Sequence, residues 1–223
     1  MSLLLGVITL GILIFSAILH EVAHGFVADH LGDPTARLAG RLTLNPRKHI
    51  DPIMSIALPL LLIISGSPVI FGAAKPVPID PFNLKEGQKD IALVSLAGPL
   101  TNIALAIIGT LIFRLFFPEF SLLQIVYSYP SMGNLSDFLA YSISFVVHLN
   151  LLLAIFNLIP IPPLDGSKVF ALLLPKELAF LYLSLSSVGM FIIFFLLLFP
   201  INGLSLGSLI FNLVSFAEHL LGF

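Results

Sequence analysis

His20, Glu21 and His24 form a His-Glu-x-x-His motif inside an apolar stretch at residues 3–27. Helix positions four apart differ by about 40° around the axis, so both imidazoles can bind one Zn²⁺. Glu21 can then reach a water molecule that the ion holds. A glutamate at membrane depth costs roughly 2.5 kcal/mol or more to insert, and such residues are functional by default. We therefore interpret this segment as a catalytic zinc helix rather than as a structural or vestigial site.

The composition indicates that this helix belongs to a polytopic membrane protein. Of the 223 residues, 58% are hydrophobic and only 10% are charged, against about 25% charged residues in soluble proteins. The chain has no cysteine, so a zinc ion must be held by His, Asp or Glu. A net charge of -2 with scattered basic residues gives no nucleic-acid footprint. The first segment has no cleavage signal, and we expect it to stay in the protein.

The apolar runs predict an all-α membrane protein with five to six transmembrane helices in one domain. A bilayer span needs about 20 apolar residues, and five runs approach this length: 3–27, 91–117, 138–158, 178–199 and 204–221. A sixth run at 53–64 contains Pro59. As a helix it reaches about 18 Å into a hydrocarbon core of about 30 Å. We therefore predict that the segment 53–71 is re-entrant.

The positions of the basic residues favour this re-entrant topology. If 53–71 does not cross the membrane, nine of the ten Lys and Arg residues lie on one side; if it crosses, each side holds five. Short cytoplasmic loops carry the excess of Lys and Arg, so we predict an outside N-terminus and an inside C-terminus. Arg114, near the outer end of its helix, is the exception and can extend to the interface. The nine others are Arg37, Arg41, Arg47, Lys48, Lys75, Lys85, Lys89, Lys168 and Lys176.

A catalytic zinc ion needs a third protein ligand and an open position. His20 and His24 lie near the predicted cytoplasmic end of their helix, and Asp165 follows a proline-rich stretch at the same end. His148 lies about 15 Å deeper on its own helix and matches this depth less well. We therefore predict Asp165 as the third ligand. Asp is also a good N-cap, so a capping role for Asp165 remains an alternative, and the two roles are compatible.

Asn157 lies at a helix end at membrane depth, where an unpaired amide is costly. It could donate to the oxyanion of a tetrahedral intermediate, or bond a carbonyl that Pro160 or Pro162 frees. The sequence does not decide between these two roles. We expect Asn102 to serve helix packing, and we expect His148 to be a satisfied interior histidine.

The segment 36–44 ends in alternating apolar and polar residues and is bounded by Pro34 and Pro46. It could form a short cytoplasmic β-hairpin whose edge pairs with an extended substrate. An ordinary cytoplasmic loop is the alternative.

Three motifs together resemble the site-2 protease family of intramembrane zinc metalloproteases: the one around Glu21, the stretch 97–102 and the stretch 157–166. The resemblance covers residues 8–170. It implies that His20, His24 and Asp165 bind zinc, that Glu21 is the general base, and that the active site opens toward the cytoplasm. The chain departs from well-known members in its insertion at 53–71. It also carries no appended PDZ or CBS domain, so the substrate and its control stay open.

The resulting hypothesis is a zinc-dependent intramembrane endopeptidase with one zinc ion per chain. We place its catalytic core at about 3–174 and additional helices at 178–221, in one domain covering 1–223. Its expected partners are the lipid bilayer and a membrane-protein substrate with a transmembrane segment, in a prokaryotic cell membrane, and no nucleic acid. A membrane zinc or ion transporter with the same ligands is the alternative. A transporter would need a polar path to both faces, and the outer halves of these helices offer little beyond Arg114 and hydroxyls.

Overall fold

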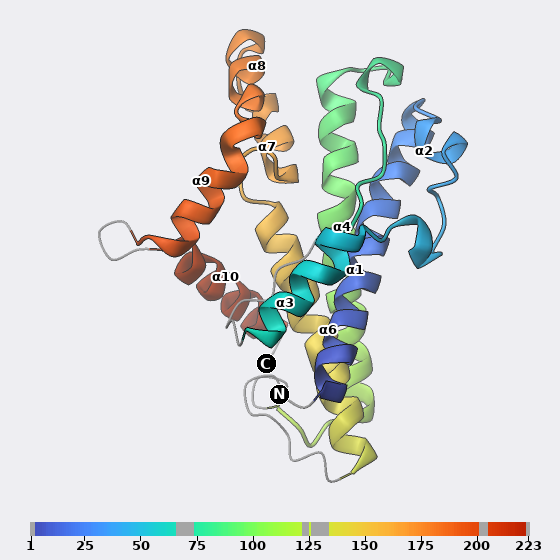
Figure 1. Ribbon diagram of the computed structural model, residues 1–223, viewed down its shortest axis with the longest axis vertical. Helices are drawn as coiled ribbons and strands as arrows, with labels where there is room; N and C mark the ends of the chain where they lie inside the picture. Colours follow the sequence, from blue (N-terminus) through green and yellow to red (C-terminus); the bar gives the residue numbers. More distant parts are fainter. Residues whose placement is uncertain (1–2, 66–73, 122–124, 126–133, 201–204, 222–223) are drawn as a thin grey trace. The chain divides into compact units, whose positions relative to one another are not determined.

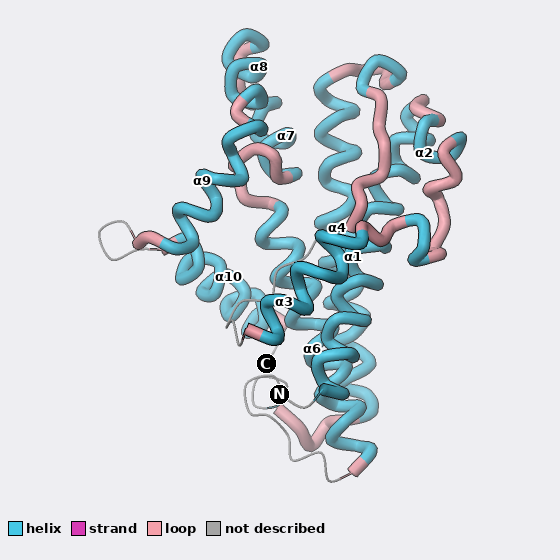
Figure 2. Tube along the Cα trace, in the orientation of Figure 1, coloured by secondary structure: helices cyan, strands magenta, loops and turns pink. Residues whose placement is uncertain are grey.

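The computed structural model describes residues 3–65, 74–121, 125, 134–200 and 205–221. The chain divides into two compact units, Met1–Asp90 and Ile91–Phe223. Within the described residues every regular element is a helix, as Figure 2 shows. The predicted all-α class is therefore confirmed.

The first unit is built around α1 (Leu3–Leu31), a helix of 29 residues. Gly32 ends it with a φ of 115°, a left-handed conformation that glycine adopts without steric cost. Five short elements follow in the chain before α4, and each is less than two turns long (Figure 1). They are α2 (Thr35–Leu38), η1 (Pro46–Lys48), the π-helical η2 (Pro52–Ala57) with the adjoining α3 (Leu58–Ile64), and η3 (Pro81–Asn83).

The predicted β-hairpin at 36–44 is wrong. Its first residues form α2, and Gly40 then turns the chain with a φ of 62°. Ala36 is completely buried, 3.0 Å from where a Cβ on Gly25 would lie. An Ala-Arg-Leu sequence after a proline has good helix propensity, and packing of Ala36 against α1 stabilises that choice. The alternation that suggested a strand begins only beyond this turn.

The described part of the predicted re-entrant segment is a short helical stretch. The elements η2 and α3 contain six and seven residues, too few to cross a bilayer as a helix. Residues 66–71 of the predicted segment lie outside the described residues. The re-entrant topology therefore stays a prediction.

In the second unit, α4 (Gln88–Phe116) and α6 (Leu135–Asn157) run antiparallel (Figure 1). The buried amides of Asn102 and Asn150 are hydrogen bonded across this pair at 2.7 Å. Gly109 allows the close approach, because a Cβ there would lie 2.9 Å from a methyl group of Val147. Small residues and polar contacts of this kind hold membrane helices together. The packing role predicted for Asn102 is confirmed.

The C-terminal part comprises α7 (Asp165–Phe170), η4 (Ala171–Leu173), α8 (Lys176–Ser184), α9 (Ser186–Leu198) and α10 (Leu206–Leu220). The helix α10 packs against α6 and α9. At its end, Arg114 of α4 donates a hydrogen bond of 2.6 Å to the carbonyl of Leu221. The end of α10 thus lies beside the last turn of α4. This contact contradicts the predicted topology, which places Arg114 and the C-terminus on opposite sides of the membrane.

Three described helices are long and apolar enough to cross a membrane: Gly6–Leu31, Gln88–Phe116 and Leu135–Asn157. A fourth span results if α8 and α9, which are bent by 64° relative to each other, count as one. The described residues therefore support three to four spans, not the five to six predicted. A close contact that hydropathy does not reveal accompanies the bend. A Cβ on Gly189 in α9 would lie 1.7 Å from the carbonyl oxygen of Pro162, so only glycine permits this contact.

Candidate metal centre

The two histidines of α1 face each other as metal ligands would. His20 and His24 are buried, with 7% and 6% of their surface exposed. Their Nε2 atoms are 3.0 Å apart, and the rings are nearly perpendicular at 87°. Two nitrogen ligands of a tetrahedral zinc ion, each about 2.0–2.1 Å from the metal, lie about 3.3 Å apart. The spacing of these two nitrogens therefore fits zinc.

Asp165 is the first residue of α7, and the turn before it depends on a glycine. A Cβ on Gly166 would lie 2.1 Å from the carbonyl oxygen of Leu158, so the chain can return against the end of α6 only with glycine there. The N-cap of α7 is Leu164, and no side-chain hydrogen bond caps this end. The capping alternative for Asp165 therefore has no support. Its carboxylate is buried and lies 3.3 Å from the ammonium group of Lys168.

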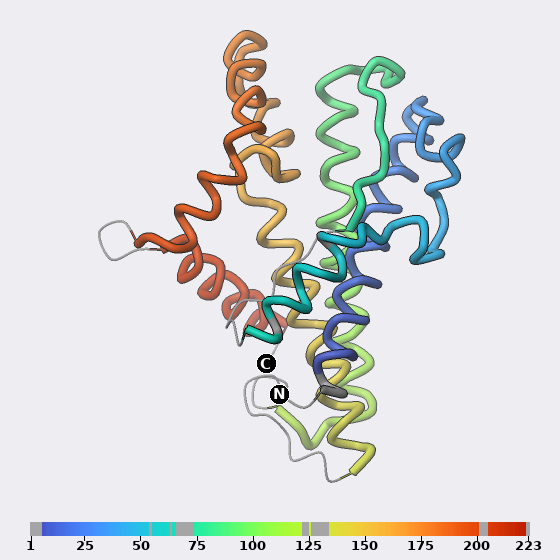
Figure 3. The backbone as a smooth tube through the Cα atoms, viewed as in Figure 1, coloured from blue at the N-terminus to red at the C-terminus, as the bar shows by residue number. Residues whose placement is uncertain are grey.

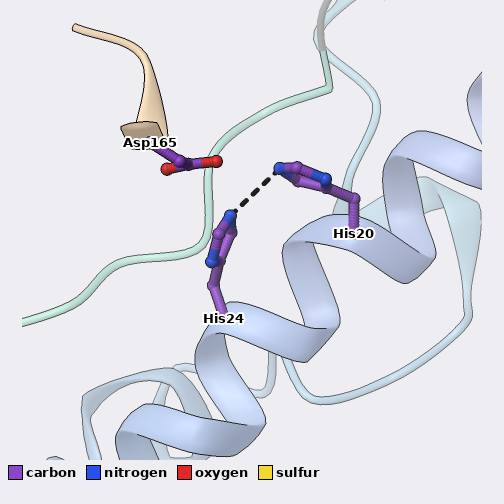
Figure 4. A group of neighbouring side chains, drawn as sticks. All are labelled: His20, His24 and Asp165. Atoms are coloured by element: carbon purple, nitrogen blue, oxygen red, sulfur yellow. Dashed lines mark hydrogen bonds between the residues drawn. The ribbon is translucent and has the colours of Figure 1, made fainter. Parts of the chain in front are cut away.

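His20, His24 and Asp165 form a group with metal-ligand spacing. One ligand atom from each residue lies within 4.8 Å of the other two. Figure 4 shows the carboxylate of Asp165 turned toward the two imidazoles. Two imidazoles and one carboxylate are a donor set of catalytic zinc sites. The burial, the donor types and the spacing of the histidine nitrogens all fit a zinc ion.

Glu21 is held by the backbone of a distant segment. It is half-buried, and its Oε2 accepts a hydrogen bond of 2.8 Å from the N–H of Val77, 56 residues away. Val77 belongs to a non-helical stretch that follows α3 in the chain (Figure 3). Sequence reasoning missed this contact. The signal available was Pro76 and Pro78, which leave Val77 as the one backbone donor among the three residues.

Asn157 donates its side-chain amide to the carbonyl of Leu153, 2.9 Å away in the preceding turn of α6. Pro160 and Pro162 lack the N–H groups that would reach the carbonyls four positions earlier, at residues 156 and 158, so neither proline frees the Leu153 carbonyl. An amide has two N–H donors, and this bond uses one of them. The oxyanion role of Asn157 stays a prediction.

His148, which lies outside the His-Glu-x-x-His motif, forms a polar pair with Glu218. Its Nδ1 lies 2.7 Å from Oε1 of Glu218, a residue of α10 with none of its surface exposed. This partner explains an imidazole on an apolar helix. The prediction of a satisfied interior histidine is confirmed.

His49 is a buried histidine of the first unit. Burial is the main reason that its pKa lies below the usual value, and the nearby Arg41 guanidinium lowers the pKa further. Its Nε2 lies 2.7 Å from the carbonyl of Thr43, a pure acceptor, so this nitrogen carries the proton. His49 therefore serves as a hydrogen-bond donor to Thr43.

Two buried histidines on a helix that is apolar enough to span a membrane, with a buried aspartate at metal-ligand spacing, are features expected of a membrane-embedded zinc metalloprotease. The model of peptidase family M50 matches residues 7–200. The chain therefore belongs to peptidase family M50, the site-2 protease family.

Two relatives illustrate the similarity. The chain is 38% identical over 187 residues to Putative zinc metalloprotease YwhC of Bacillus subtilis (strain 168), covering 83% of this chain and 77% of that protein. It is 34% identical over 151 residues to Putative zinc metalloprotease Rip2 of Mycobacterium tuberculosis (strain H37Rv), covering 68% of this chain. The matched region spans 51% of Rip2. No solved structure matches the chain.

Proposed function

We propose that this member of family M50 is an intramembrane endopeptidase that cleaves membrane proteins within or beside their transmembrane segments. Family membership makes it a zinc-dependent metallopeptidase. The observation that carries the finer proposal is the buried group of His20, His24 and Asp165 beside Glu21. The two histidines and Glu21 lie on a helix that is long and apolar enough to span a bilayer. A peptide bond cleaved there would lie at membrane depth.

The proposed roles follow from the chemistry of each side chain. His20, His24 and Asp165 are the metal ligands. They would hold a zinc ion, and the bound ion would supply a lowered pKa for its water molecule and polarisation of the scissile carbonyl. Glu21 accepts the proton of the attacking water and delivers it to the leaving amine. Asn157 offers its second amide N–H to the oxyanion of the tetrahedral intermediate.

The substrate segment must be extended at the cleavage site. In a helix each carbonyl accepts an i to i−4 hydrogen bond, and neighbouring turns shield it from attack. A substrate that stays helical would keep its carbonyls away from Glu21. Substrates whose transmembrane helix contains glycine or proline near the cleavage site should therefore be cut faster, because these residues weaken the helix.

The orientation that we propose has the N-terminus outside and the active site toward the cytoplasm of a prokaryotic cell. Its support is the excess of Lys and Arg in the loops that follow α1, together with the bacterial origin of YwhC. The chain has no cysteine, so single cysteines can be labelled selectively. Cysteines at the exposed positions Ala39 and Glu86 should be protected in intact cells, while one at Glu119 should react. If a cysteine at position 86 is labelled from outside while one at position 39 is protected, the segment 53–71 crosses the membrane.

We also propose that residues 1–223 act as one metalloprotease domain, because the proposed ligands come from both halves of the chain. The transporter alternative is not favoured, since the relatives are named as metalloproteases.

The test is cleavage of a model transmembrane substrate by the purified, reconstituted protein. Glu21→Gln should lower kcat by about 10²–10⁴-fold, the usual contribution of a general base. Its zinc content should stay at one ion per chain, because the amide replaces no ligand. Glu86→Gln is the matched control: Glu86 is exposed, 3.4 Å from Lys89, and its charge is removed in the same way. Full activity of zinc-loaded Glu21→Gln would contradict the proposed mechanism.

A further inference from the structure

Residues 74–80, which we call the strap, form an extended stretch between α3 and η3 (Figure 3). The strap is fixed at four points, each to a different part of the first unit. The contacts are Lys75 N–H to the His49 carbonyl at 2.8 Å, Arg41 Nη2 to the carbonyls of Lys75 and Pro76 at 2.7 and 3.2 Å, Val77 N–H to Glu21 Oε2 at 2.8 Å, and Asp80 N–H to Asp33 Oδ2 at 2.7 Å.

The centre of the strap is built to present a single backbone donor. Pro76 and Pro78 have no N–H, so Val77 supplies the only backbone donor of the three residues. A residue before proline is restricted to extended conformations, so Pro78 keeps Val77 extended without help from a neighbouring strand. That one donor is directed at the carboxylate of Glu21.

The Val77 side chain secures this donor against α1. It is 6% exposed, and its Cγ1 would lie 2.8 Å from a Cβ on Gly25, one helical turn after Glu21. The approach is closer than any real Cβ contact, so it depends on glycine at position 25. Packing and hydrogen bonding therefore fix the same residue at the same place on α1.

We propose that the Val77 N–H is a positioning group for Glu21, and this inference rests on the proposed function. A glutamate side chain has three rotatable bonds, and an exposed carboxylate loses orientation by rotating about them. The Val77 N–H holds Oε2 and so fixes the orientation of the carboxylate. Oε1 is left as the oxygen that accepts the proton of the attacking water. A carboxylate has about four acceptor sites, so one donor orients the group without blocking it.

The catalytic test compares two variants at one position in the full-length, zinc-loaded protein. Val77→Pro removes the N–H and retains an extended backbone, whereas Val77→Ala retains the N–H and removes the side chain. Val77→Ala therefore measures the cost of lost packing alone. We expect kcat of Val77→Pro to lie about tenfold or more below that of Val77→Ala, with KM and zinc content equal in the two. Equal kcat values would overturn the proposal, and so would a higher kcat in Val77→Pro, since that would mean that the strap inhibits Glu21.

Amide hydrogen exchange tests the contact without any cleavage assay and without Val77→Pro, which could unfold. Among residues 76–78, Val77 carries the only exchangeable backbone amide. Glu21→Ala should speed the exchange of the Val77 amide. The control Glu86→Ala, which removes an exposed glutamate outside the strap, should not. Unchanged exchange at Val77 in Glu21→Ala would overturn the contact. If the wild-type protein cleaves no substrate, the proposed function fails, yet this exchange result still tests the strap.

Discussion

Asp33 holds the C-terminal end of the strap, where it accepts a hydrogen bond from the Asp80 N–H. The substitution Asp33→Asn is a quantitative test of the hydrogen bonds that Asp33 accepts. Asp33 follows Gly32 after α1 and has none of its surface exposed. Its carboxylate accepts hydrogen bonds from the Thr35 N–H at 3.1 Å, the Thr35 hydroxyl, the Asp80 N–H at 2.7 Å and Asn83 Nδ2 at 3.0 Å. Burial raises the pKa of Asp33, but these hydrogen bonds together outweigh it and hold the pKa below the usual value.

The expected loss of stability in Asp33→Asn follows from the hydrogen-bond donors around the carboxylate. Asparagine has the same shape but only one acceptor oxygen, while donors approach both oxygens of Asp33. In either orientation of the amide, its NH2 group faces at least one N–H. Hydrogen bonds to a charged group contribute roughly 1.5–3 kcal/mol each, and the lower cost of burying a neutral amide offsets part of the loss. We expect a loss of about 2–4 kcal/mol in the free energy of unfolding. The corresponding drop in Tm is about 4–16 °C for a chain of this size.

The stability difference between wild type and Asp33→Asn should decrease as the pH falls. Because folding lowers the pKa of Asp33, its carboxylate contributes stability that is fully present above the unfolded pKa of about 3.9. That contribution is lost as the pH falls through the folded pKa. The amide that replaces the carboxylate in the variant cannot titrate. The Tm difference between wild type and Asp33→Asn should therefore be constant above about pH 5 and shrink in more acidic solution.

The assay is thermal unfolding of the purified protein in detergent between pH 7 and pH 4. Glu119→Gln, which removes an exposed carboxylate, is the control and should leave Tm within about 1 °C. A Tm of Asp33→Asn equal to that of wild type at pH 7 would refute the argument. So would a Tm difference that grows as the pH falls.

Two further predictions concern the second unit and the metal. His20→Ala, His24→Ala and Asp165→Ala should each reduce zinc below one ion per chain in metal analysis, together with activity. Normal zinc in Asp165→Ala would assign the third ligand to another residue. Glu218→Ala should lower the free energy of unfolding by about 1–3 kcal/mol, because it leaves the hydrogen-bonding group of His148, now 2.7 Å from Glu218, without this partner. An unchanged unfolding midpoint would show that this pair contributes no stability.

The placement of the two histidines of α1 is well predicted from the sequence because its information is local. His20, Glu21 and His24 lie within about one helical turn, so their relative placement follows from helix geometry alone. The prediction of Asp165 as the third ligand needed the further assumption that two helix ends lie at the same depth. Polar pairs such as Asn102 with Asn150 were predictable only in part. A polar residue on an apolar helix implies that it has a hydrogen-bond partner, but the sequence does not identify that partner.

The failures all involve contacts between distant parts of the chain. Apolar runs at 178–199 and 204–221 are long enough to suggest two spans, but the close contact of Gly189 with Pro162 accompanies a bent α8–α9 pair. The segment 36–44 has a strand-like alternation, yet burial of Ala36 against α1 favours a helical turn. The Val77 contact involves a backbone N–H. Pro76 and Pro78 single out Val77 as a donor, but no residue type identifies Glu21 as its acceptor.

The strap contacts a stripe of α1 next to the two histidines. Positions four apart on a helix lie on nearly the same face. His20 and His24 therefore form one stripe of α1, while Glu21 and Gly25 form the adjacent stripe. The strap lies along this second stripe, since Val77 bonds Glu21 and packs on Gly25. A side chain at position 25 would move the strap away from α1, and the N–H of Val77 away from Glu21, without touching either histidine. Gly25 thus couples Glu21 to the strap, just as the four-residue spacing places the two histidines where one metal ion could bind both.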